Sequence, residues 1–130
     1  MFRATVAALA LSLSTLCWAG EAPRLGQEAL LEKMAAGNGD VIVLDVRTAK
    51  EFAEGHVPGA VNISHDELEA RLAELGPVRD KEVVVYCRSG RRSDLALGLL
   101  EKAGFERLYH LEGDFLGWVE ARRPVETPPE

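Results

Sequence analysis

The sequence predicts an α/β fold in which a central, mostly parallel β-sheet is flanked by helices. Two apolar runs, 41–46 and 82–86, are rich in valine and show little polar alternation, which is typical of strands buried on both faces. Each run is followed by segments with helical spacing of apolar residues. Strands that alternate with helices in this way indicate a parallel sheet.

The N-terminal half begins with a helix and a strand. Residues 25–36 carry apolar side chains at helical spacing, and the glycines at 37 and 39 end this helix. The apolar run 41–46 follows as the first buried strand. The sequence therefore predicts that the sheet begins directly after a single N-terminal helix.

Two capping boxes predict the next two helices. Thr48 and Glu51 form the first box, which begins a short helix that ends at residue 54. Ser64 and Glu67 form the second box, and it precedes a helix whose leucines stand at i, i+4 and i+7. These leucines are Leu68, Leu72 and Leu75.

The C-terminal half continues the alternation of strands and helices. After the strand 82–86 we expect a helix over 93–103, which Gly104 ends. A short strand over 107–111 and a helix over 115–121 complete the predicted fold.

The first nineteen residues predict a secretory signal peptide, residues 1–19. One basic residue, a short apolar stretch and a small residue at its end match such a signal, and no acidic residue precedes Glu21. The stretch is short for a membrane span and is broken by serine and threonine. We therefore expect a periplasmic or secreted protein that is not attached to a membrane after cleavage, with one domain over 20–123 and a disordered, proline-rich tail over 124–130.

The charge of the chain limits its partners. Its formal net charge is −6, which argues against nucleic acid as a partner because phosphate binding needs a basic surface. Against this acidic background, three arginines gather just after residue 87. Such a local basic cluster predicts a small anion as the ligand.

Cys87 is the candidate nucleophile. It directly follows the strand 82–86, and a turn that contains Gly90 and the arginines comes next. A tight loop points its N–H groups at one centre, and the helix that follows adds the positive end of its dipole. Both effects favour the thiolate form. A buried structural thiol is the alternative role for such a cysteine.

The position of Cys87 also predicts its neighbours. Ligands of parallel sheets bind at the carboxyl ends of the strands, so Cys87 and Asp45 are expected on the same rim. Asp45 and Arg47 either line this rim or form an ion pair that fastens the first strand to a nearby loop. The sequence has no second cysteine for a Cys-x-x-Cys pair and no His/Cys cluster with zinc spacing, so no metal is expected.

Four segments of the chain resemble the single-domain rhodaneses, sulfurtransferases that carry sulfur as a cysteine persulfide. They are Leu-Asp-Val-Arg at 44–47, the stretch 51–63 with Gly-His-Val-Pro-Gly-Ala, Tyr-Cys-Arg-Ser-Gly-Arg-Arg-Ser at 86–93, and 104–118 with Leu-Glu-Gly and Trp118. With its signal peptide, the chain most resembles the small exported rhodaneses of the bacterial phage-shock type. The resemblance implies a three-layer rhodanese-like fold.

The resemblance also implies a reaction in two steps. The Cys87 thiolate attacks the outer sulfur of thiosulfate, sulfite leaves, and cyanide or a thiol then removes the sulfur from the persulfide. No metal or organic cofactor is implied. The substrate-binding residues that it implies are Arg88, Ser89, Gly90, Arg91 and Arg92.

The length of the loop separates sulfur transfer from related chemistry. Cys87 to Arg92 spans six residues, as in sulfurtransferases, whereas cysteine phosphatases and arsenate reductases of this fold place the arginine one residue later, where Ser93 stands. Three alternatives to a sulfurtransferase remain at this point. They are a persulfide carrier for a protein partner, a cysteine phosphatase or arsenate reductase, and a degenerate rhodanese used only for binding.

Four further residues have predicted roles. His56 is expected to bond within its own turn, while His65 and His110 are expected at the surface or at a strand edge. Asp114 stands where the rhodanese pattern usually has a second glycine, and aspartate tolerates the left-handed backbone that such a turn requires.

Overall fold

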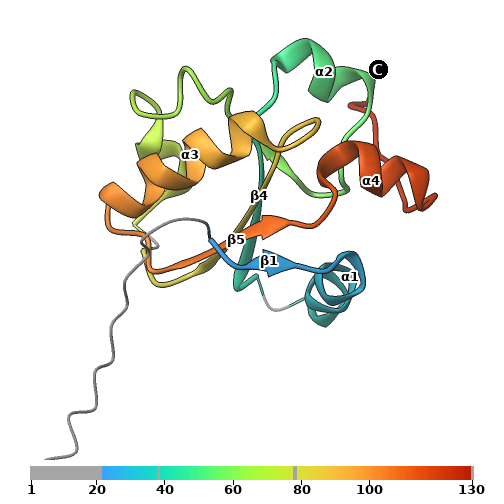
Figure 1. Ribbon diagram of the computed structural model, residues 1–130, viewed down its shortest axis with the longest axis horizontal. Coiled ribbons are helices and arrows are strands. Elements are labelled where there is room, and N and C mark those ends of the chain that lie inside the picture. The colour runs from blue at the N-terminus through green and yellow to red at the C-terminus, as the bar shows by residue number, and fades with distance from the viewer. Residues whose placement is uncertain (1–21, 38, 78, 130) are drawn as a thin grey trace, which may run out of the picture.

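The computed structural model describes residues 22–129, except 38 and 78. In this part of the chain five strands form one parallel sheet in the order β1-β5-β4-β2-β3 (Figure 1). The strands are β1 (Arg24–Leu25), β2 (Val41–Asp45), β3 (Val61–Asn62), β4 (Glu82–Tyr86) and β5 (Arg107–Leu111). The helices are α1 (Gln27–Ala36), α2 (Ala49–Glu54), α3 (Arg91–Lys102) and α4 (Asp114–Glu120), together with the 3₁₀ helix η1 (Leu72–Leu75).

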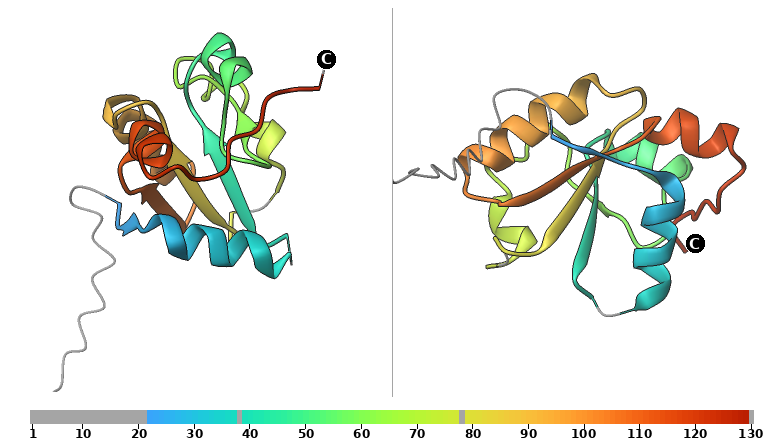
Figure 2. Two further views of the ribbon diagram at one scale, coloured as in Figure 1. Left: turned by 90° about the vertical axis from the view of Figure 1, so that its right-hand side faces the viewer. Right: turned by 60° about the horizontal axis from the view of Figure 1, so that its bottom comes forward.

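Alternate side chains of the central strands face two separate cores. Val83, Val85 and Cys87 pack in the core that α3 covers, whereas Val84 and Tyr86 pack in the core that α1 and α4 cover. Figures 1 and 2 show α3 and α1 on opposite sides of the sheet. This arrangement confirms the predicted three-layer α/β fold, and it places the Cys87 side chain on the α3 side.

Most of the predicted elements are confirmed. The strands β4 and β5 have the predicted bounds, and α2 begins with the predicted capping box between Thr48 and Glu51. The helix α3 begins at Arg91, two residues before the predicted start, because the backbone turns into the helix at Gly90. The sequence did not predict β1 and β3, since each has only two residues.

The predicted helix after Ser64 is wrong. Residues 65–71 form turns, and only the short 3₁₀ helix η1 follows. The Ser64 hydroxyl donates to Asp66 Oδ1 at 2.5 Å instead of capping the backbone at Glu67. Leu68 and Leu75 are nevertheless buried, so the apolar spacing located the core residues correctly but not the type of backbone.

The tail predicted over 124–130 contacts the domain at residues 124–126. His56 and Glu126 form an antiparallel bridge in which each backbone N–H donates to the other carbonyl at 2.9 Å. The Trp118 indole N–H donates to the Pro124 carbonyl at 2.7 Å. Glu126 therefore lies beside His56, in the turn that follows α2.

The predicted signal peptide, residues 1–19, lies outside the described residues. Among the residues that are described, no helix has the length and apolar character needed to cross a membrane.

Candidate functional site

Cys87 directly follows the carboxyl end of β4 and begins a closed loop. The residue is 1% exposed, and the Gly90 N–H donates to its sulfur with 3.0 Å between the two atoms. Gly90 has φ +123°, a conformation that side-chain-bearing residues rarely adopt. The loop thus aims a backbone donor at the sulfur, which favours a negative charge there.

The loop is held from behind by the start of α4. One oxygen of Asp114, Oδ1, accepts from the Cys87 N–H at 3.0 Å and from the Ser93 hydroxyl at 2.9 Å. The Phe115 N–H donates to the Cys87 carbonyl at 2.9 Å, and the Leu116 N–H donates to the Arg88 carbonyl at 3.1 Å. These contacts fix both the beginning of the loop and the first turn of α3.

Asp114 adopts the backbone conformation that the sequence predicted for it, with φ +53°. Burial alone would raise the pKa of this carboxyl group. Hydrogen bonds from His110, from the Cys87 N–H and from Ser93 outweigh the burial, so the pKa is lowered and the group stays ionised.

A salt bridge from α2 positions the Arg92 side chain. The guanidinium donates to both oxygens of Glu51, at 2.6 Å and 3.0 Å. This hydrogen bonding is the main reason why the pKa of Arg92 is raised, and the neighbouring Cys87 sulfur adds a smaller contribution. Arg92 is therefore a fixed positive charge beside the sulfur, with its planar fork already oriented.

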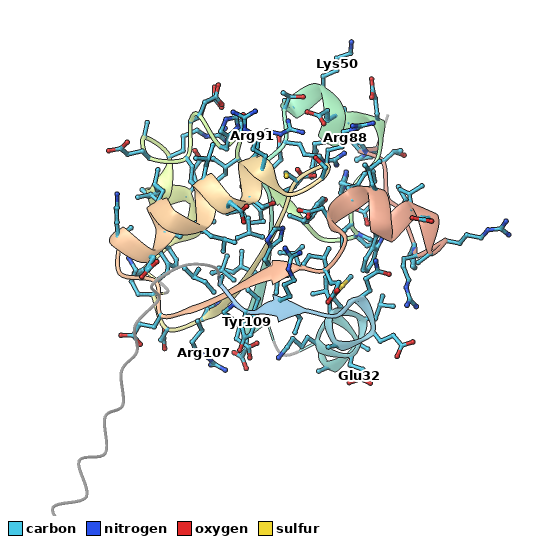
Figure 3. The ribbon with its side chains drawn as sticks, viewed as in Figure 1. Glu32, Lys50, Arg88, Arg91, Arg107 and Tyr109 are labelled. Carbon is cyan, nitrogen blue, oxygen red and sulfur yellow. The ribbon has the colours of Figure 1, made fainter. Side chains whose placement is uncertain are left out.

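The other two arginines of the loop region are exposed. Arg88 and Arg91 lie at the same end of the molecule as Lys50 of α2 (Figure 3). Ser89, which stands between Arg88 and Gly90 in the chain, is also exposed. Of the three arginines, Arg92 is the one that a salt bridge to α2 holds in place.

The salt bridge to Arg92 predicts an acid-dependent stability. Hydrogen bonding from Arg92 is the main cause that lowers the pKa of Glu51 from 4.5 to about 2. Because the folded-state pKa lies below the unfolded one, this stabilisation is present above pH 4.5 and is lost as the pH falls toward about 2. We expect Glu51→Gln to lower the unfolding midpoint at neutral pH, with a difference from the wild type that shrinks over this acid range.

Thermal unfolding at a series of pH values checks this expectation. Glu54→Gln, at the exposed end of the same helix, is the matched control and should follow the wild type throughout. A Glu51→Gln difference that stays constant down to pH 2 would contradict the assigned cause of the shift.

Asp45 and Arg47 do not line an open rim. Asp45 lies at the same edge of the sheet as Cys87, but its side chain points to the opposite face, since successive residues of a strand alternate. Both side chains are buried, and Arg47 donates to Asp45 at 2.6–3.0 Å and to the Gly55 carbonyl at 2.7 Å. The structure supports the alternative role, an ion pair that fastens β2 to the loop after α2.

The predicted position is confirmed for His56 and wrong for His110. His56 bonds to its own turn through Nδ1 and the Phe52 carbonyl, 2.9 Å apart, as predicted. His110 is 3% exposed, so the prediction of a surface or edge position is wrong. The short strand β1 pairs outside β5, and β5 therefore lies inside the sheet.

Sequence reasoning missed three residues that support the loop. Glu51 was assigned only to its capping box, and His110 and Asp114 were not connected with Cys87. The available signal was the aspartate that replaces the second glycine of the rhodanese pattern, four residues after a histidine. Within the described residues, no group of three or more His, Cys, Asp or Glu side chains could hold a metal ion.

Comparison with known proteins gives the family. The profile of the rhodanese-like domain matches residues 27–121. A sulfurtransferase from Allochromatium vinosum is 33% identical over 104 residues, which cover 80% of this chain and 94% of that protein. A putative sulfur carrier protein from Bacillus subtilis is 32% identical over 101 residues, which cover 78% of this chain but only 53% of that protein.

Solved structures agree with this assignment. A rhodanese-related protein from Thermoplasma volcanium superposes with a TM-score of 0.70 at 30% identity, covering 82% of this chain and 99% of the other. A protein of unknown function from Rhodopseudomonas palustris, described as a possible tyrosine phosphatase, has a TM-score of 0.70 at 28% identity. The match covers 81% of this chain and 85% of the other. The family profile spans most of the chain and includes the loop at Cys87, and the chain belongs to the rhodanese family.

Proposed function

We propose that this protein transfers sulfane sulfur from thiosulfate, or a similar small anionic donor, through a persulfide on Cys87 to cyanide or a thiol. The observation that carries the proposal is the Gly90 N–H that points at the Cys87 sulfur inside a six-residue loop. Membership of the rhodanese family and similarity to a protein named as a sulfurtransferase support it.

The proposed reaction balances in two steps. The Cys87 thiolate attacks the outer sulfur of thiosulfate, an S–S bond to Cys87 forms, and the S–S bond of thiosulfate breaks as sulfite leaves with the electron pair. Cyanide then attacks the terminal sulfur of the persulfide, thiocyanate leaves, and the thiolate returns. Both steps conserve charge, and neither needs a metal or an organic cofactor.

The site suits a small, anionic donor. Cys87 is 1% exposed, so the donor must present a narrow sulfur atom to the loop rather than a bulky group. Arg92, which Glu51 holds beside the sulfur, would bind the sulfonate end of thiosulfate through its oriented fork. Production of thiocyanate from thiosulfate and cyanide tests this function directly, and no thiocyanate at any donor concentration would oppose it.

A persulfide carrier is the second candidate, supported by similarity to the putative sulfur carrier protein of Bacillus subtilis. Such a carrier needs the same loop, but its acceptor is a protein thiol. A very low kcat/KM with cyanide, together with fast transfer to a protein thiol, would favour the carrier.

A cysteine phosphatase is disfavoured by the loop. Ser93 stands where those enzymes need an arginine, and its hydroxyl is used to bond Asp114. Hydrolysis of an aryl phosphate that disappears in Cys87→Ser would reverse this ranking.

Arg92→Ala is expected to raise the KM for thiosulfate roughly tenfold or more, as the loss of one charge-assisted contact implies. Arg122→Ala removes an exposed arginine beyond α4 and should leave KM unchanged. Steady-state kinetics with varied thiosulfate and saturating cyanide measure the difference.

A double variant separates two causes of this effect. Arg92→Ala also leaves the Glu51 carboxylate without its partner, which by itself would repel an anion. Glu51→Gln combined with Arg92→Ala removes that repulsion. We expect the double variant to keep most of the defect, whereas full recovery of KM would show that Arg92 only screens Glu51.

We also propose that residues 1–19 direct export and that the mature protein acts in the periplasm or outside the cell. The support is the apolar, acid-free N-terminal sequence. Cell fractionation with N-terminal sequencing of the isolated protein tests it, and an intact Met1 on protein recovered from the cytosol would contradict it.

A further inference from the structure

A buried histidine–aspartate pair lies directly behind the Cys87 loop. His110 of β5 is 3% exposed and Asp114 of α4 is 2% exposed. The His110 Nε2 atom lies 3.0 Å from Asp114 Oδ1 and 2.9 Å from Oδ2. Neither side chain has a place in the two steps proposed above, although burying an ion pair normally costs stability.

Asp114 closes the loop around the sulfur. Its Oδ1 oxygen joins the Cys87 N–H at one end of the loop to the Ser93 hydroxyl in the first turn of α3. Its Oδ2 oxygen lies behind Gly90, where an added Cβ atom would come within 3.1 Å of it. The carboxylate thus lies against Gly90, the residue whose N–H donates to the sulfur.

The same carboxylate is an electrostatic disadvantage. A negative charge behind the loop opposes a thiolate, a persulfide anion and an anionic donor alike. A compensating charge for Asp114 is best supplied by a direct neighbour, because Arg88 and Arg91 are exposed and the Arg92 guanidinium is already paired with Glu51. The ring of His110 is that neighbour, since a Cβ atom on Gly90 would come within 3.4 Å of its Cε1.

Two carboxylates face the ring of His110. Asp114 faces Nε2 from α4, and Asp94 Oδ1 of α3 lies 3.5 Å from Nδ1. From β1, the exposed Arg24 lies beside His110 in the sheet register. Only an imidazolium presents a proton to both carboxylates, because a neutral ring turns a lone pair toward one of them.

We propose that His110 is a positioning residue for Cys87: its imidazolium neutralises the Asp114 carboxylate that closes the loop, and so keeps the sulfur reactive. The two residues have different roles. Asp114 accepts the hydrogen bonds from Cys87 and Ser93 that close the loop, and the positive charge of His110 offsets the negative charge of Asp114 near the sulfur. This inference rests on the proposed role of Cys87 as the nucleophile.

Alkylation of Cys87 by iodoacetamide across a pH series tests the pair without any sulfur donor. The assay uses a Cys17→Ser background, in which Cys87 is the only thiol of the chain. His110→Gln keeps a donor for Asp114 but carries no charge. We expect it to react several-fold more slowly at neutral pH, because the uncompensated Asp114 carboxylate opposes the anionic sulfur.

A second substitution distinguishes charge compensation from structural support. Asp114→Asn keeps an oxygen that can accept from Cys87 and Ser93 but removes the charge. Added to His110→Gln, it should restore most of the alkylation rate, because the uncompensated carboxylate is then gone. His65→Gln is the matched histidine control and should react like the parent protein.

Two results would overturn the proposal. One is a His110→Gln variant that reacts like the parent at every pH, and the other is a double variant as slow as His110→Gln alone. If His110→Gln does not fold, Asp114→Asn with the native histidine provides the test. It should react at least as fast as the parent protein, because the carboxylate that opposes the anionic sulfur is gone, and slower alkylation would contradict the role assigned to its charge.

The outcomes of the two proposals can be told apart. Slow alkylation of His110→Gln that Asp114→Asn restores would support the positioning pair even if the protein made no thiocyanate. Conversely, the native protein could produce thiocyanate while His110→Gln is alkylated as fast as the parent. That result would support the proposed function and contradict the positioning role of His110 and Asp114.

Discussion

Replacing Cys87 with serine is expected to abolish sulfur transfer from thiosulfate to cyanide while the protein stays folded. A serine hydroxyl is not ionised at neutral pH and cannot form a persulfide, so neither step of the reaction can begin. The side chain is nearly the same size, and the Gly90 N–H can donate to oxygen as it does to sulfur. Thiocyanate production should therefore fall to the rate measured without enzyme.

Circular dichroism and thermal unfolding of the same preparation verify the fold of the variant. Cys17→Ser is the matched control, because it removes the other cysteine of the chain and should leave turnover unchanged. Turnover in Cys87→Ser above the rate without enzyme would place the nucleophile elsewhere.

The largest loss of stability is expected from Arg47→Leu. Asp45 has no exposed surface, and Arg47 donates to both of its oxygens. The Tyr86 hydroxyl also donates to Asp45, at 2.7 Å. The pKa of Tyr86 is raised, mainly because the hydroxyl is buried and also because the Asp45 carboxylate lies beside it. Leucine in place of Arg47 leaves a buried, uncompensated charge, which typically costs about 3–5 kcal/mol in the free energy of unfolding.

Urea denaturation measures this loss, and two further variants interpret it. Asp45→Asn combined with Arg47→Leu removes the stranded charge and should recover part of the stability. Arg71→Leu breaks exposed ion pairs with Glu67 and Glu74 and should hardly move the urea midpoint. An Arg47→Leu midpoint equal to that of Arg71→Leu would show that the buried pair does not hold β2 to the loop after α2.

Regular elements with strong local signals were predictable from the sequence. The valine-rich runs at β2 and β4 can be buried only inside a sheet covered on both faces, and the capping box at Thr48 and Glu51 begins α2 as predicted. The position of Cys87 directly after β4 followed from the second of these runs. The sequence therefore predicted where the candidate nucleophile lies relative to the sheet.

Where contacts compete, local or distant, the sequence pattern did not decide the structure. Ser64 and Glu67 have the spacing of a capping box, but the Ser64 hydroxyl bonds Asp66 and the backbone turns instead. Glu126 of the tail forms a bridge to His56, seventy residues earlier. A local side chain thus decided the backbone after Ser64, and a distant strand edge contacts Glu126.

The supporting residues of the site were hidden for the same reason. His110 becomes an interior residue only because the two-residue strand β1 covers β5, and such a strand is too short to predict. Glu51 reaches Arg92 across 41 residues of chain. The sequence predicted the chemistry of the loop, whereas the side chains that hold the loop emerge only from the packing of α2, β5 and α4.

The most direct test of the account is the intact mass of the Cys17→Ser protein after treatment with thiosulfate. We expect a gain of about 32 Da, one sulfur atom, on the thiolate that the loop stabilises, and its removal by cyanide. The gain should be absent when Cys87 is also replaced by serine. An unchanged mass in the protein that retains Cys87, or the same gain in the protein without it, would contradict a persulfide on Cys87.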